Sequence, residues 1–234
     1  DGHRARSETT FSGALGAVWR VAPEWTLALS ATQTRRAPNA QELFADGPHA
    51  GTQAYEIGDD DLGTERSTGL EVSLRRRVGD VTGAVSVFTN RFAGYIFGQP
   101  TELVAVEHKG GWKFVDEHNP EAADHGGLPV FRTVQRAANF WGFEVEALWH
   151  LHEAPGSQFD VRFTADFVRA KEGGRPLPRL PEARAGVGLL WASAAWTFGV
   201  DYLHAFPQRQ VAAHETNSDG YRLIGANVSR ALKL

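Results

Sequence analysis

Two kinds of connection alternate along this chain of 234 residues, and the alternation limits the possible folds more than any other feature. Between the connections lie about nine segments in which apolar and polar residues take turns. The tight turns are at residues 21–24, 78–80, 153–156 and 192–194. The long, polar connections are at about 37–64, 100–129, 171–181 and 208–219. Transmembrane β-barrels combine short periplasmic turns with longer extracellular loops. The pattern therefore predicts an all-β fold, an antiparallel transmembrane β-barrel fragment built from long meander strands.

The strands that this pattern predicts have two chemically different faces, because successive side chains of a strand point to opposite sides. The expected strands span residues 9–21, 25–36, 65–77, 81–98, 130–152, 158–170, 182–191, 195–207 and 220–232. We expect the apolar face to meet lipid, through Phe159, Val161, Phe163, Phe143, Val145 and Leu74. We expect the charged face to line the lumen, through Asp160, Arg162, Glu144, Glu146 and Arg75.

A soluble antiparallel sandwich shows the same alternation and is one alternative. Two features favour the membrane barrel. Several expected strands exceed the usual length of about five or six residues, and their polar face is rich in Glu, Asp and Arg. The tryptophans near the short turns also suit an aromatic girdle at the headgroups: these are Trp19, Trp25, Trp149, Trp191 and Trp196. Solubility that depends on detergent would separate the two folds.

Composition excludes several classes of function. The net charge of −4 provides no basic surface for nucleic acid. The chain has no cysteine, which excludes disulfides and thiolate metal sites. No apolar run approaches the roughly 20 residues that a transmembrane helix needs. We expect no resident cofactor.

Four motifs in order suggest a family. Residues 35–44 read R-R-A-P-N-A-Q-E-L-F and residues 58–67 read G-D-D-D-L-G-T-E-R-S, followed by N-R-F-A-G-Y-I at 90–96 and A-N-F-W-G-F-E-V-E at 138–146. The chain resembles TonB-dependent outer-membrane receptors, whose barrels carry R-x-P-x-x-x-E-L-[FY] and then G-[ND]-x-x-L-x-x-E-x-S. The resemblance implies energised import of a scarce solute across the outer membrane of a Gram-negative bacterium. It also implies three partners: outer-membrane lipid, a metal ion or metal complex, and TonB acting through a plug domain.

Within this family the stretch G-P-H-A at residues 47–50, followed by Y-E-I-G-D at 55–59, is most similar to the zinc-uptake branch. His49 is the residue that carries over by motif position, and Glu56 could bring a carboxylate to the same space. The preferred solute is therefore a metal ion, zinc first. A receptor for a siderophore or haem complex is the alternative within the family.

Family members have an N-terminal plug and about 22 barrel strands. We expect residues 1–234 to be one partial barrel domain from the middle to late part of such a receptor, without the plug and the closing strands. The sheet should then be open and strongly curved, with the strands at 9–21 and 220–232 as unpaired edges.

The histidines supply the candidate metal ligands, since imidazole and carboxylate both suit zinc. The chain has nine, and the connection at 100–129 holds His108, His118 and His125 among acidic residues. The predicted metal set is His49, His118, His125 and Glu56. The alternatives are a solvated extracellular loop for His108, His118 and His125, and packing among loop residues for His49. His150 and His152 share a strand face with Glu144 and Glu146 and are expected to be rim residues, with a lumen-side metal pair as the alternative. The acidic run at 59–61 lacks the twelve-residue calcium pattern and is expected to cap a loop.

No sequence motif supports catalysis, since the chain contains no G-x-S-x-G elbow, Walker loop or H-E-x-x-H. We therefore expect that the protein is not an enzyme. An outer-membrane barrel enzyme with a lumenal Ser/His/Asp site remains the alternative from another class, and an assay for lipase or protease activity would test it.

Overall fold

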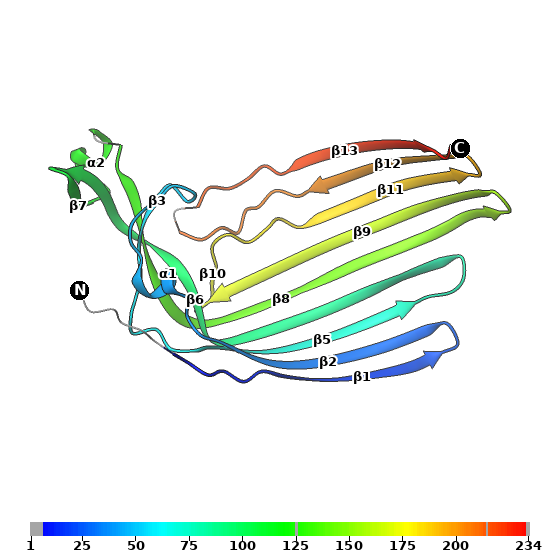
Figure 1. Ribbon diagram of the computed structural model, residues 1–234, viewed down its shortest axis with the longest axis horizontal. Coiled ribbons are helices and arrows are strands. Elements are labelled where there is room, and N and C mark those ends of the chain that lie inside the picture. The colour runs from blue at the N-terminus through cyan, green and yellow to red at the C-terminus, as the bar shows by residue number, and fades with distance from the viewer. Residues whose placement is uncertain (1–6, 125, 214, 233–234) are drawn as a thin grey trace. The chain divides into compact units, whose positions relative to one another are not determined.

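The computed structural model describes residues 7–124, 126–213 and 215–232, which fold into one 13-stranded sheet with two short helices (Figure 1). Nine strands follow one another in the order β1-β2-β5-β6-β8-β9-β11-β12-β13. Their bounds are β1 Gly13–Ala22, β2 Trp25–Arg36, β5 Glu65–Arg76, β6 Val81–His108, β8 Leu128–Ala154, β9 Ser157–Glu172, β11 Arg184–Ser193, β12 Trp196–Ala205 and β13 Tyr221–Arg230. Each expected strand therefore corresponds to one strand of this path, and the all-β prediction is confirmed.

Two strands run further than the sequence pattern indicated. β6 has 28 residues and β8 has 27, and both extend into the connection predicted at 100–129. The extension of β6 pairs with β7 (Gly111–Asp116), from Leu103 opposite Asp116 to His108 opposite Gly111. Lys109 and Gly110 form the turn with φ values of 50° and 77°. The long connection expected at 100–129 thus contains a hairpin, in which the ladder between β6 and β7 satisfies the backbone groups.

The connection at 37–64 also has structure of its own. It holds α1 (Ala40–Phe44), β3 (Asp46–His49) and β4 (Ala54–Ile57). β3 pairs with β4 in antiparallel register, and Tyr55 of β4 lies opposite Val130 of β8 in a parallel pairing. Two small elements complete the fold: β10 (Arg175–Pro176), which pairs with β9, and α2 (Pro120–Asp124). No helix among the described residues has the length and apolar character that crossing a membrane requires.

The chain divides into two compact units, each described by itself. The first comprises residues 1–13, 33–67 and 92–138, and the second comprises 14–32, 68–91 and 139–234. The first unit contains both helices and the short strands β3, β4 and β7. It has two small apolar cores, one of Leu43, Leu62 and Ile96, and one of Tyr55, Ala105 and Val130. These cores hold the long connections against the first unit's own strands.

In the second unit the register of β9, β11 and β12 separates two faces. Arg162, Gly188 and Asp201 lie opposite one another, and the next row is Phe163, Val187 and Tyr202. The apolar face has no second sheet over it in the part of the chain that the structure describes. Its exposed members include Phe163, Leu189, Trp191, Phe198 and Val200. A soluble sandwich would bury such a face, whereas lipid would cover it.

The sheet does not close within the described residues. β1 has β2 as its sheet neighbour and β13 has β12, so these two strands end the path. They are the two edges that the sequence predicted.

Candidate functional site

A cluster of charged side chains in the first unit joins the two halves of the signature motif. Nε and Nη2 of Arg36 donate to the two carboxylate oxygens of Glu65, at 3.2 and 3.0 Å. Nη1 of Arg36 donates to both oxygens of Glu42, at 3.0 and 2.7 Å. The Glu65 side chain is 10% exposed and also accepts from the backbone N–H of Ile96 at 2.8 Å. Arg36 therefore neutralises a nearly buried carboxylate and fastens α1 to the strands.

α1 begins with a capping box that accounts for another part of the motif. Oδ1 of Asn39 accepts from the N–H of Glu42, and the Glu42 carboxylate accepts from the N–H of Asn39, both at 2.8 Å. This reciprocal pair satisfies two backbone donors that a helix N-terminus leaves open. The short helix is thus held by the same carboxylate that binds Arg36.

From α1 the contacts lead to the predicted metal residues. Nε2 of Gln41 donates to Oε2 of Glu56 at 2.8 Å, and Oγ1 of Thr52 donates to Oε1 of Glu56 at 2.9 Å. Nδ1 of His49 lies 3.9 Å from Oε1 of Glu56 and 3.2 Å from Oγ1 of Thr52. The structure brings His49 and Glu56 together on the β3–β4 hairpin. The Glu56 carboxylate is oriented by two hydrogen bonds, while the His49 side chain is 48% exposed.

His118 lies in a separate group. Its Nδ1 is 3.1 Å from Oδ1 of Asp116 and 4.0 Å from Oε1 of Glu117. The backbone N–H of His118 donates to the same Asp116 oxygen, and this bond, followed by that of the ring, lowers the pKa of the Asp116 carboxyl. His108 ends β6 in the neighbouring hairpin. His125 lies outside the described residues.

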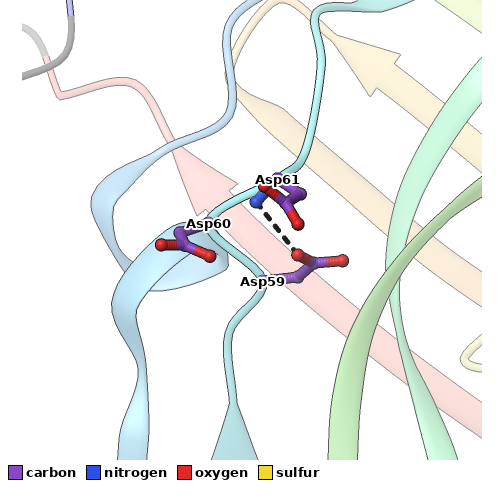
Figure 2. Close-up of side chains that lie close together, drawn as sticks. All are labelled: Asp59, Asp60 and Asp61. Atoms are coloured by element: carbon purple, nitrogen blue, oxygen red, sulfur yellow. Dashed lines mark hydrogen bonds between the residues drawn. The ribbon is translucent and has the colours of Figure 1, made fainter.

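Three adjacent carboxylates, Asp59, Asp60 and Asp61, lie together after β4 (Figure 2). Among residues 7–124, 126–213 and 215–232 they form the one group of at least three His or acidic residues whose ligand atoms lie within 4.8 Å of one another. The N–H of Asp61 donates to Oδ1 of Asp59 at 3.0 Å. This local bond closes a turn, as expected for a run that caps a loop.

An aromatic cluster lies on the β4 and β7 strands. The Tyr55 ring meets Trp112 and Phe114 edge-on, with centroids 5.5 and 5.1 Å apart. The Tyr55 hydroxyl donates to Oδ1 of Asp46 at 2.8 Å. Burial and the Asp46 carboxylate together raise the pKa of the Tyr55 phenol. Trp112 and Phe114 remain 38% and 42% exposed, so part of this aromatic cluster lies at the surface.

The second unit contains a broad hollow of about 630 Å³, lined by polar and apolar residues in equal number. Its polar lining includes Arg75, Ser86, Glu144, Glu146, Asp166 and Arg184. Ion pairs cross the charged face of this unit, from Arg184 to Asp166 at 3.1 Å and from Arg162 to Asp201. A face of this kind requires water or a polar partner, because unpaired charges are costly to remove from water.

The family model described as "TonB dependent receptor-like, beta-barrel" matches residues 1–232. The chain belongs to this family. Receptors of this family lie in the outer membrane of Gram-negative bacteria, and that is the location of this protein. Receptors of this family are transporters rather than enzymes.

Solved structures of other receptors share the fold. The copper transporter OprC has a TM-score of 0.71 and 19% identity, over 95% of this chain and 31% of its own. The siderophore receptor PirA from Acinetobacter baumannii has a TM-score of 0.60 and 15% identity, over 93% and 34%. A variant of the ferric enterobactin receptor PfeA from Pseudomonas aeruginosa has 0.58 and 15%, over 95% and 32%. This chain spans about a third of the length of each, and these matches do not single out zinc.

The sequence predicted His49 and Glu56 as metal ligands, but it did not indicate the contacts around them, in which Gln41 binds Glu56 and Arg36 binds Glu65. Gln41 and Arg36 both belong to the signature motif, and their roles become visible only through contacts with Glu56 and Glu65. The spacing Asn39-x-x-Glu42 was the available signal, since it is a capping-box pattern that places a helix inside the loop. The motif thus contacts the hairpin that carries His49, through the hydrogen bond from Gln41 to Glu56.

Proposed function

We propose that this protein, as part of a TonB-dependent receptor, takes part in the active uptake of a scarce solute, a metal ion such as zinc, across the outer membrane. The observation that carries the proposal is the His49–Glu56 pair, with a separation of 3.9 Å between Nδ1 and Oε1. Nitrogen and oxygen ligands of one tetrahedral zinc ion lie about 3.4 Å apart, given bond lengths of about 2.1 Å. A small rotation of the exposed imidazole closes the difference.

The surroundings of Glu56 support a ligand role. Gln41 and Thr52 each donate a hydrogen bond to it, one to each carboxylate oxygen. Such outer partners orient a ligating carboxylate and tune its affinity. Two protein ligands leave coordination positions open, which suits a site that must release its ion.

His118 and His125 form the weaker part of the proposed metal set. The His118 ring is 84% exposed and lies beside the carboxylates of Asp116 and Glu117. We propose that this segment collects metal ions by charge and passes them to the His49 hairpin, so its histidines add less affinity than His49.

A siderophore or haem complex is the second candidate solute. The exposed rings of Trp112 and Phe114 favour it, because aromatic surfaces stack on planar organic ligands. PirA is a siderophore receptor, and PfeA is a ferric enterobactin receptor. At a sequence identity of 15%, these two receptors show only that this chain shares their fold.

We further propose that residues 1–234 form a partial barrel domain, and that a plug domain outside this chain couples transport to TonB. In this arrangement the hollow that Glu144, Glu146 and Arg75 help to line faces the lumen. The chain would then supply the transport path and the outer site, and energy would reach it through the plug.

The metal proposal is tested by titrating zinc into the intact receptor in detergent and measuring the binding by isothermal titration calorimetry. His49→Ala and Glu56→Gln should each weaken zinc binding about 10- to 100-fold, and His118→Ala/His125→Ala should weaken it less. His152→Ala is the matched control, since its exposed ring lies outside the loop. Equal affinity in all variants would remove the support for zinc. If the receptor binds a ferric siderophore tightly and does not bind zinc, the result would favour the siderophore or haem complex as the solute.

A further inference from the structure

Two arginines lie on the opposite face from the Arg36 cluster. The Thr34 and Ser67 hydroxyls bond at 2.7 Å, and Arg36 bonds Glu65, so these four side chains share one face of β2 and β5. Successive side chains of a strand point to opposite faces. Arg35 and Arg66 each lie between two of these residues in sequence and therefore share the other face.

A cavity of about 420 Å³ lies beside these two arginines. It is lined by Arg35, Thr64, Arg66, Ala93, Gly94 and Gln135. Nε2 of Gln135 donates to the carbonyl oxygens of Gly63 and Gly94, at 2.9 and 3.1 Å, and its Oε1 accepts from the N–H of Gly63 at 2.9 Å. These three hydrogen bonds hold the Gln135 side chain in place at one side of the cavity. A Cβ at Gly94 would come within 2.9 Å of Gln135 Nε2, so the glycine keeps this corner open.

The cavity carries positive charge. No ion pair joins Arg35 or Arg66 to a carboxylate in the part of the chain that the structure describes. One carboxylate lies nearby, since Oγ1 of Thr64 donates to Oε2 of Glu8 at 2.8 Å. Two guanidinium groups against one carboxylate leave an excess of donors, which attracts an anion.

The positions of Arg35 and Arg66 along their strands indicate which kind of anion could reach the cavity. Arg35 lies near the end of β2 and Arg66 near the start of β5, on either side of a long connection that would face outside. Along each strand the residues of the same parity become apolar, with Leu29 in β2 and Leu70 in β5 exposed. A cation just beyond an apolar, lipid-facing stretch lies at the level of the headgroups.

We propose that Arg35 and Arg66 form a phosphate-binding site for an anionic lipid of the outer leaflet. The planar guanidinium fork matches phosphate oxygens in two-point hydrogen bonds. The Thr64 hydroxyl borders the same cavity and stays engaged with Glu8.

Native mass spectrometry of the intact receptor in detergent tests this site. The probes are phosphatidic acid, phosphatidylcholine and inorganic phosphate. Each arginine near an anionic headgroup contributes about fivefold in affinity, so Arg35→Gln/Arg66→Gln should weaken phosphatidic acid binding about 25-fold. Arg35→Lys/Arg66→Lys keeps the charge and should lose less. Arg162→Gln/Arg184→Gln removes the same charge from ion-paired residues of the other unit and should leave lipid binding unchanged.

Three outcomes would overturn the proposal. The first is equal phosphatidic acid binding in wild type and Arg35→Gln/Arg66→Gln. The second is equal loss in Arg162→Gln/Arg184→Gln, which would mean that overall charge controls the binding. The third is that inorganic phosphate binds the cavity as tightly as phosphatidic acid and displaces it, which would assign a free anion as the ligand. Selective loss of phosphatidic acid in the Arg35/Arg66 variant, with weak phosphate binding throughout, supports the lipid.

Discussion

His150 and Asp160 lie in contact on neighbouring strands of the second unit, with Nδ1 of the partly exposed imidazole 3.0 Å from Oδ1 of the carboxylate. The Asp160 side chain is 2% exposed and also accepts from Nε2 of Gln158. Nε2 of His150 lies 3.4 Å from Oγ1 of Thr82. The prediction that His150 is a plain rim histidine did not include this contact with a nearly fully buried carboxylate.

His150→Ala should destabilise the receptor, since it leaves a buried acceptor with one partner fewer. We expect a loss of about 1–3 kcal/mol in the free energy of unfolding. The measurement is urea- or heat-induced unfolding in detergent micelles, followed by the mobility of the folded band on a gel. His152→Ala, two residues further along the strand and exposed, is the control and should change little. Equal stability of the two variants would contradict the structural role.

Arg36→Ala should loosen the first unit, because Glu65 would stay nearly buried with no cation beside it. The expected loss is about 1–3 kcal/mol. Arg36→Ala/Glu65→Gln should recover part of it, since the amide carries no charge. Hydrogen exchange of residues 40–57 measures the local effect. Arg35→Ala, next in sequence and on the opposite face, is the control, and faster exchange in it would argue against the Arg36 cluster as the cause.

The Tyr55 phenol should titrate above its ordinary value of 10.0, because burial and Asp46 favour the neutral form. A raised pKa in the folded state means that its contribution to stability is complete below about pH 10 and is lost as the pH rises through the folded value. Absorbance of the tyrosinate at alkaline pH measures the titration. Tyr55→Phe should remove one late-titrating group, and Asp46→Asn should move that group toward lower pH. A titration unaffected by Asp46→Asn would contradict the assignment.

Leu189→Lys should oppose membrane insertion, because Leu189 lies on the exposed apolar face opposite Val161. A lysine on a lipid-facing position near mid-bilayer costs about 2–4 kcal/mol. Leu190→Lys, on the other face and opposite Asp160, is the matched control and should insert normally. Folding yield into lipid vesicles measures both. Equal yields would mean that the two faces do not differ in their contact with lipid.

Local patterns in the sequence determined the nine principal strands and their two faces. The period of two in β9 places Phe163 and Arg162 on opposite sides whatever the strand pairs with. The Asn39-x-x-Glu42 spacing likewise contains its own helix start, since both partners lie within one turn. The signature motif also determined the family, which the match over residues 1–232 confirms.

Tertiary structure decided which distant residues meet. Arg36 and Glu65 are 29 positions apart, and Gln135 and Gly63 are 72 apart. β6 continues through residues that carry no clear alternation, because β7 folds back to satisfy its backbone. Periodicity reports only the side to which a residue points. Partners of a carboxylate, the length of a paired strand and the opening of a cavity depend on strand register, and register arises from contacts between segments far apart in the chain.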